Sequence, residues 1–141
     1  MELAQQHIRS TRDGGVGRAG ANKVVVVLTD GVPNLYVSDP ADVDLYMREN
    51  PSSDFYNTGE YWKDAPLMRA AQMHSQSWQL FPVGIGLGTD YDFMDRMARM
   101  GGTANQDGQS PRGSGNPAEY EQRLTAIFEA IITNPQVRLV Q

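Results

Sequence analysis

An unbroken aliphatic run at residues 23–29 (KVVVVLT) constrains the fold more than any other feature of the sequence. A run of this kind, without alternating polar positions, is typical of a parallel strand that is covered on both faces. Residues 80–86 (LFPVGIG) predict a second buried strand. Because Pro82 cannot donate a hydrogen bond to a strand ladder, we expect it at the start of that strand or at a sheet edge.

Helical patterns surround the two runs. Residues 2–12 have helix-forming composition, and residues 64–78 place apolar and aromatic positions on one face. Asp90 can cap a helix that ends at Gly101 and Gly102. The residues expected to face inward are Leu67, Ala71, His74 and Trp78 in the first of these two helices and Phe93, Met94, Met97 and Met100 in the second. For the methionine stripe, ordinary core packing is the favoured interpretation.

The segment 116–119 (NPAE) resembles a capping box with proline at the first helical position. It predicts a last amphipathic helix that stops before Pro135, and residues 137–140 (VRLV) could form a final strand. The inward residues of this helix would be Tyr120, Leu124, Ile127, Phe128 and Ile131.

Buried strands that alternate with amphipathic helices predict an α/β fold with a mostly parallel sheet and helices on both faces. At 141 residues the chain has the size of one domain, so residues 1–141 are treated as a single unit. No run reaches the roughly 18 apolar residues that a membrane span requires, so we expect no membrane segment in this chain. The absence of cysteine excludes disulfides and thiolate metal sites.

Residues 31–61 are rich in proline, glycine, asparagine and aspartate, which predicts a long loop with at most one short helical turn near 42–48. The whole net charge of −5 lies between residues 35 and 64, where seven acidic residues face two basic ones. An acidic surface disfavours phosphate backbones, so nucleic acid is excluded as a partner class. The aromatic residues of this acidic loop, at about 32–62, either form a partner-recognition rim or pack onto the sheet within a solvated insertion.

In open α/β sheets, ligands gather beyond the carboxyl ends of the strands, where Asp30 and the segment 84–90 would lie. A carboxylate at this edge can hold a hard divalent cation directly or through water. Alternatively, Asp30 only caps the turn through Val32, Pro33 and Asn34. The glycines at 84, 86 and 88 lack the spacing of a nucleotide-binding loop, so close packing or a tight turn explains them better.

The succession KVVVVLTDGVPN, a helix, LFPVGIG, DFMDRMARMGG and a terminal amphipathic helix resembles the carboxyl-terminal half of the von Willebrand factor A (VWFA) domain, from its third major helix onward. The segments MGGTANQDG and YEQRLTAIFEAIITNPQVRLVQ most resemble bacterial Tad pilus-assembly proteins that carry this domain. The resemblance implies a doubly wound, Rossmann-like sheet. It also implies a non-enzymatic protein-binding, adhesion or pilus-assembly role in the cell envelope.

The resemblance further implies a metal-ion-dependent adhesion site in which Mg²⁺ or another divalent cation bridges to an acidic side chain of a protein partner. That site uses a D-x-S-x-S loop, a threonine from a middle loop and the aspartate of TDG, and only the last is matched, at Asp30. The site is therefore incomplete in this chain, and the missing amino-terminal half of the domain is a second candidate partner. The expected partner-binding rim consists of Thr29, Gly31, Asn34, Tyr36, Asp39, Asp42 and Asp44.

Two other interpretations remain open. One is a Mg²⁺-dependent phosphohydrolase-like enzyme with Asp30 as metal ligand or nucleophile, which would need further carboxylates and a lysine at neighbouring strand ends. The only lysines are Lys23 and Lys63. The other interpretation is a truncated product without independent function. Without the first strand of the family, residues 23–29 would have an open edge, so we expect a marginally stable or self-associating chain.

Overall fold

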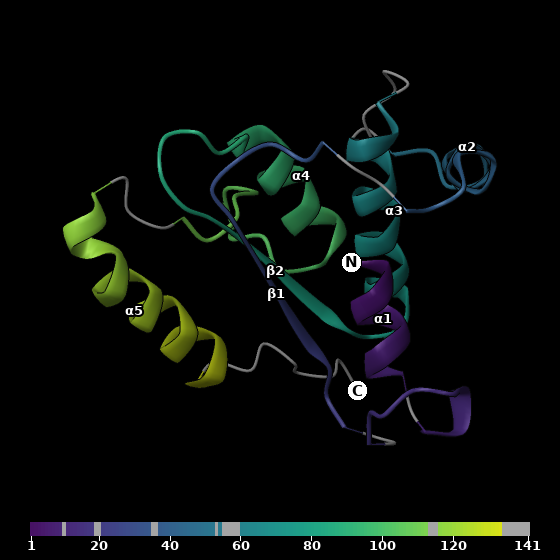
Figure 1. The fold of residues 1–141 in the computed structure, drawn as a ribbon, viewed down its shortest axis with the longest axis horizontal. Coiled ribbons are helices and arrows are strands. Elements are labelled where there is room, and N and C mark those ends of the chain that lie inside the picture. The colour runs from purple at the N-terminus through teal and green to yellow at the C-terminus, as the bar shows by residue number, and fades with distance from the viewer. Residues whose placement is uncertain are drawn as a thin grey trace.

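Two parallel strands form the centre of the structure, a computed structural model that describes residues 1–9, 11–18, 21–34, 37–52, 54, 60–112 and 116–133. Helices α3 and α1 lie on one side of the strands and helix α5 on the other (Figure 1). No helix among these residues is both long enough and apolar enough to cross a membrane. The elements are α1 (Glu2–Ile8), a 3₁₀ turn η1 (Thr11–Asp13), β1 (Val24–Thr29), α2 (Pro40–Glu49), α3 (Tyr61–Ser75), β2 (Gln79–Gly84), α4 (Tyr91–Met100), a 3₁₀ turn η2 (Pro117–Glu119) and α5 (Tyr120–Thr133).

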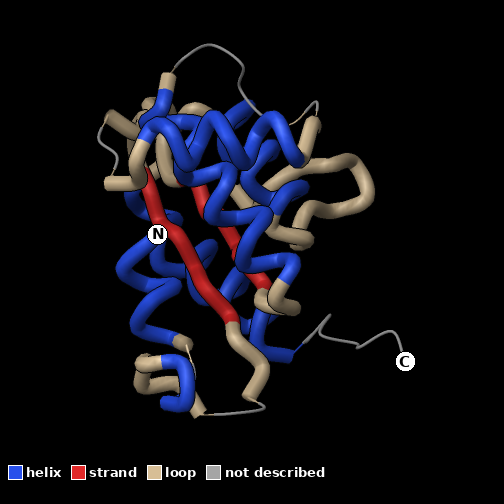
Figure 2. Tube along the Cα trace, turned by 90° about the vertical axis from the view of Figure 1, so that its right-hand side faces the viewer, coloured by secondary structure: helices blue, strands red, loops and turns tan. Residues whose placement is uncertain are grey.

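The parallel pairing predicted for the two apolar runs is confirmed. Strands β1 and β2 lie side by side (Figure 2), in register from Val24 opposite Gln79 to Thr29 opposite Gly84. Backbone hydrogen bonds continue the ladder at both ends, from Gln79 N to Lys23 O (2.9 Å) and from Ile85 N to Thr29 O (2.8 Å). The fold is therefore mixed α/β with a parallel sheet, as the alternation of elements predicted.

Pro82 lies in the middle of β2, opposite Val27, so of its two predicted places, the start of the strand and a sheet edge, the start is wrong. The physical reason is the alternation of the ladder. Residues 79 and 85 donate to β1, so every second residue between them also faces β1 and Pro82 faces away from it. On that outer side the described residues make only one isolated bridge, between Gly84 and Arg112. The missing N–H of Pro82 therefore costs β2 no bond to β1, as at an edge position.

The core lies between one face of the sheet and helices α3 and α4. Val25 and Leu80 are register partners, and both are buried. The helices contribute a cluster of large apolar side chains: Leu67, Met68 and Met73 from α3, and Phe93, Met94 and Met97 from α4. The methionine stripe of α4 is thus part of the core, as the sequence predicted.

The predicted inward face of α3 is partly wrong. His74 is exposed and the neighbouring Met73 is fully buried in its place, because α3 packs against α2, α4 and β2 at once. Trp78 is buried, but it follows the helix, which runs from Tyr61 to Ser75. In α1 the polar residue Gln5 is buried, whereas Leu3 is exposed.

The predicted loop at 31–61 contains a ten-residue helix, α2, which corrects the expectation of one short turn. Asp39 caps this helix, since its Oδ1 accepts a hydrogen bond of 2.8 Å from Ala41 N, and Pro40 occupies the first helical position. Val43 is fully buried and anchors the helix to the core. An aspartate followed by proline indicates a helix start, but the polar composition of the surrounding residues favours a loop.

Asn116 caps the 3₁₀ turn η2 that leads into α5, but the reciprocal backbone bonds of the predicted capping box are not formed. Asn116 Oδ1 accepts a hydrogen bond from Ala118 N (3.2 Å), and Asn116 Nδ2 donates to Glu119 Oε1 (3.3 Å). The expected inward residues Leu124, Ile127, Phe128 and Ile131 are only half-buried. The side chain of Tyr120 and residues 137–140 lie outside the described residues. Helix α5 is therefore the least well packed of the long helices.

The described residues form a sheet of two strands. The edge of β1 that faces away from β2 pairs with no described residue. Val24 and Leu28 on this strand are 40% and 47% exposed. An apolar edge with unpaired backbone groups is a template for strand addition. We therefore expect the isolated chain to self-associate and Leu28→Lys to shift it toward monomer in sedimentation analysis. A monomer with a sharp, concentration-independent unfolding transition would contradict this expectation.

Candidate functional site

Asp30 directly follows β1, at the carboxyl edge where the sequence predicted a ligand site. Its side chain is exposed, and no described residue forms a hydrogen bond or an ion pair with its carboxylate. Thr29, not Asp30, holds the turn, because Thr29 Oγ1 accepts a hydrogen bond from Gly31 N at 3.2 Å. The interpretation of Asp30 as a turn cap therefore loses support, and its carboxylate is available for a ligand.

The segment that follows β2 lies beside Asp30. The Thr89 hydroxyl is 2.9 Å from Ile85 O and 3.4 Å from Thr29 O, so this segment is tied to the end of β1. A Cβ added at Gly88 would lie 3.1 Å from Asp30 O. The two carboxyl ends thus form one surface, as expected for adjacent parallel strands.

The glycines of this segment serve packing and turn geometry. A Cβ at Gly84 would lie 2.7 Å from Thr89 Cγ2 and 2.7 Å from Tyr91 Cε1, closer than real Cβ contacts allow. Gly86 has a φ of +80°, which disfavours other residues. Its carbonyl accepts a hydrogen bond of 3.0 Å from the Tyr91 hydroxyl. The interpretation of close packing and a tight turn is confirmed.

Lys63 joins the first turn of α3 to the start of α4. Its Nζ is 3.3 Å from Glu60 Oε2 and 3.2 Å from Asp90 Oδ2. Burial opposes the charge of Lys63, but hydrogen bonds and charge interactions with the two carboxylates outweigh it and raise its pKa. Asp90 Oδ1 also caps α4 by accepting from Phe93 N at 3.0 Å, as predicted. The Lys63 ammonium is therefore paired with the carboxylates of Glu60 and Asp90.

Asp64 is a buried acid that was not singled out from the sequence. The residue is 2% exposed, and its Oδ1 is buried without a hydrogen-bond partner among the described residues. Burial, and then the charges of Asp44 and Glu60, raise its pKa from 3.8 to about 6. The spacing to Leu67 and Met68, three and four residues later, placed Asp64 on the inward face of α3, and this signal could have identified it.

The residues of the expected rim have separate local roles. Asp39 caps α2, and Asp44 is exposed and accepts a hydrogen bond of 3.2 Å from the Tyr61 hydroxyl. Asn34 and Asp42 are exposed, whereas Tyr36 lies outside the described residues. In the part of the chain that is described, no three Asp, Glu or His side chains form a group that could hold a metal ion.

The aromatic residues of the acidic segment were expected either to form a partner-recognition rim or to pack onto the sheet. Tyr46 and Tyr61 are half-buried and pack against the core, and burial raises the pKa of Tyr46. Trp62 is also half-buried, and Phe55 and Tyr56 lie outside the described residues. The described aromatic side chains therefore support packing onto the domain more than an exposed recognition rim.

A complete Mg²⁺ site requires about six oxygen ligands. At the carboxyl edge the described residues offer one free carboxylate, that of Asp30, and the Thr29 hydroxyl is already hydrogen-bonded to Gly31. The residues present therefore do not fit a complete divalent-cation site. Any full coordination sphere would need water or oxygen ligands from outside the described residues.

Comparison of the chain with protein-family models gives no match. No curated protein and no solved structure matches it either. The resemblance to VWFA domains therefore rests on the sequence motifs around Asp30, the second strand and the last helix.

Proposed function

We propose that this chain is a non-enzymatic protein-binding module of VWFA type, of the kind that serves pilus assembly in the bacterial cell envelope. In this proposal the two-stranded sheet is part of a doubly wound sheet, and the partner binds at its carboxyl edge. One observation carries the proposal: Asp30 leaves β1 at that edge with an exposed carboxylate that no described residue engages. A surface carboxylate that the fold itself does not use is available for recognition.

The exposed acidic side chains of α2 support the same function. Asp42, Asp44 and Glu49 are exposed on this helix, and the structural cap formed by Asp39 fixes where the helix begins. Of the two basic residues of the segment, Lys63 already pairs with Glu60 and Asp90, and Arg48 is exposed on α2 and donates from Nε to Asp44 O at 3.2 Å, so α2 keeps an excess of acidic side chains. A surface of this charge favours partners with basic groups or partners that bind through a shared cation.

A divalent cation belongs to the proposal only as a contact of Asp30. Asp30 would supply one carboxylate, and water or the amino-terminal half of a VWFA domain would supply the other oxygen ligands. In such a site the cation would link the module to an acidic side chain of its partner. The test must therefore separate the role of Asp30 from the role of the surrounding acidic surface.

Affinity capture with wild-type protein, Asp30→Asn and Asp42→Asn makes this separation. From a bacterial envelope extract we expect the wild type to retain a protein in Mg²⁺ and to lose it in EDTA. Asp42→Asn, which removes one charge of the acidic surface, should retain the same protein in a reduced amount that still depends on Mg²⁺. Asp30→Asn should retain less than a tenth of the wild-type amount under both conditions. Equal retention by Asp30→Asn would contradict the proposal. Phosphatase activity that disappears in Asp30→Asn would instead favour the phosphohydrolase interpretation.

A further inference from the structure

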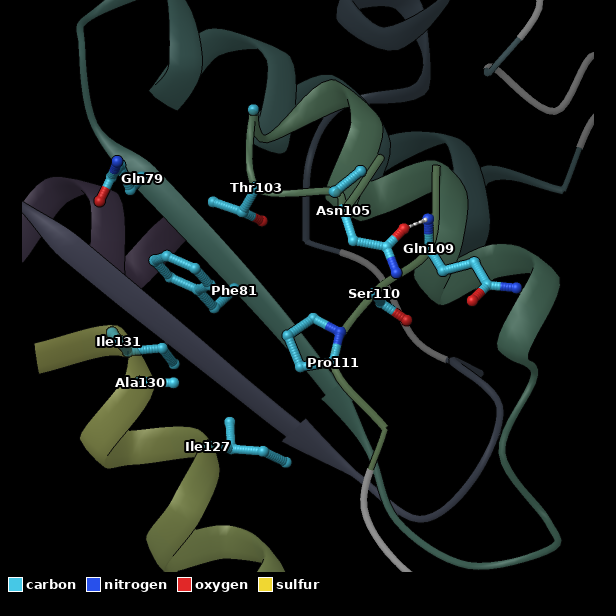
Figure 3. Close-up of a pocket in the computed structure, with 12 residues that line it drawn as sticks. Gln79, Phe81, Thr103, Asn105, Gln109, Ser110, Pro111, Ile127, Ala130 and Ile131 are labelled. Carbon is cyan, nitrogen blue, oxygen red and sulfur yellow. Dashed lines mark hydrogen bonds between the residues drawn. The ribbon is translucent and has the colours of Figure 1, made fainter. Parts of the chain in front are cut away.

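A pocket of about 360 Å³ lies between β2 and α5, away from the carboxyl edge (Figure 3). Phe81 forms one wall, and Ile127, Ala130 and Ile131 of α5 form the opposite wall. The segment from Gly102 to Pro111 closes the remaining side. The volume falls within the range of small-molecule sites, which is roughly 300–1,000 Å³.

Hydrogen bonds fix the loop side of the pocket, whereas the α5 side is incompletely packed. The loop side is fixed, because Thr103 Oγ1 donates to Leu80 O and Ser110 Oγ donates to Asp95 Oδ1 at 2.8 Å. On the α5 side, Ile127 and Ile131 are only half-buried. Their apolar surface would become covered if a ligand filled the space between them and Phe81, which favours binding.

Asn105 supplies one oriented polar group to the pocket. Its Oδ1 accepts hydrogen bonds from Asp107 N at 3.0 Å and from Gln109 N at 2.8 Å. Its backbone N donates to Gln109 O at 2.9 Å. These bonds assign the two side-chain atoms: Oδ1 faces Gln109 N, as the dashed line in Figure 3 shows, and Nδ2 is the other atom of this pocket-lining amide. Among the described residues, none accepts a hydrogen bond from this nitrogen.

The chemistry of the lining selects the ligand. None of the twelve residues that line the pocket is charged, so an ionic ligand would lose its hydration without gaining a counter-charge. The walls are apolar and include the ring of Phe81, and Asn105 Nδ2 can donate one hydrogen bond. We propose that this pocket binds a small, neutral, mainly apolar molecule whose single acceptor oxygen receives a hydrogen bond from Asn105 Nδ2. This site is independent of Asp30 and of the function proposed above.

Benzophenone, which has two apolar rings and one carbonyl, is a suitable probe. Its isostere 1,1-diphenylethene has the same shape without the acceptor, so the ratio of their dissociation constants isolates the hydrogen bond. We expect saturable binding of benzophenone in an NMR titration, with shifts at the Asn105 side-chain amide and at Ile127 and Ile131. The isostere should bind roughly two- to tenfold more weakly, as a single net hydrogen bond predicts.

Variants make the test specific. Asn105→Asp keeps an oxygen for the two backbone donors but replaces the donor Nδ2 by an acceptor, so it should no longer bind benzophenone more tightly than the isostere. Ile127→Trp should fill the pocket and abolish binding, whereas Ala126→Trp, at an exposed position on the same helix, should leave it unchanged. Thermal unfolding confirms that each variant is folded. The proposal is overturned if the wild type shows no saturable binding, if it binds both compounds equally, or if folded Ile127→Trp binds like the wild type.

Discussion

Leu80→Ala is expected to lower the free energy of unfolding by about 3 kcal/mol, within the range of roughly 2–5 kcal/mol for large-to-small core changes. Leu80, the second residue of β2, is fully buried and belongs to the core cluster. Its Cβ also contacts the turn after α4, since a Cβ at Gly101 would lie 3.0 Å from it. Hydrogen bonds from Leu80 N to Gly101 O and from Thr103 Oγ1 to Leu80 O restrain the surrounding backbone, which limits its collapse into the cavity. Urea denaturation followed by circular dichroism measures the change.

Leu87→Ala is the matched control for this prediction. Leu87 follows the same strand but is 95% exposed, so its loss should change the unfolding free energy by less than about 0.5 kcal/mol. A loss below about 1 kcal/mol for Leu80→Ala would mean that β2 is not the centre of the core. Equal losses of unfolding free energy for the two variants would contradict the assignment of Leu80 to the core and of Leu87 to the surface.

Asp64→Asn is expected to raise the unfolding free energy at pH 7.5 by roughly 1–3 kcal/mol. The pKa of Asp64 is raised from 3.8 to about 6 in the folded chain, chiefly because burial disfavours the charged form. Well below pH 3.8 the Asp64 carboxyl is protonated in both the folded and the unfolded chain, so its ionisation does not change the free energy of unfolding. As the pH rises from about 4 to 6, the unfolded chain releases its proton first, so stability falls and stays lower above pH 6. Asparagine has no ionisable side chain, so Asp64→Asn avoids this loss of stability.

The pH profile distinguishes this cause from a general effect of substitution. The wild type should lose stability between about pH 4 and 6, and Asp64→Asn should lack this decline. Asp42→Asn, on the exposed face of α2, should retain the wild-type profile. A decline that persists unchanged in Asp64→Asn would show that another group causes it. Thermal unfolding across this pH range supplies the measurement.

The sheet and the amphipathic helices were predictable because their signals are periodic and local. The run at 23–29 and the Phe93 and Met97 spacing each depend on one strand or one helix. The position of Pro82 was predictable only as one of two places, the strand start or a sheet edge, because the choice depends on which side of β2 faces β1. Neither was the exposure of His74, since that depends on where α2 and α4 meet α3.

For the candidate site, the sequence predicted the place of Asp30 but not its surroundings. Asp30 follows a strand directly, so its position at the carboxyl edge needed only the strand assignment. The use of Asp39 as a helix cap depends on α2, a helix whose one buried residue is Val43 and whose hydrophobic pattern is therefore weak. The pocket beside Phe81 is formed by segments distant in sequence, and no local pattern predicts it.

Paramagnetic broadening by Mn²⁺ tests most directly whether Asp30 is the cation contact of this module. Adding Mn²⁺ to the labelled protein should first broaden the backbone amide signals of Gly31, Gly86 and Thr89, which surround the carboxyl ends of β1 and β2. Asp30→Asn should remove this broadening, and Asp42→Asn should leave it in place. Broadening that begins on α2 and is the same in Asp30→Asn and wild type would contradict the account.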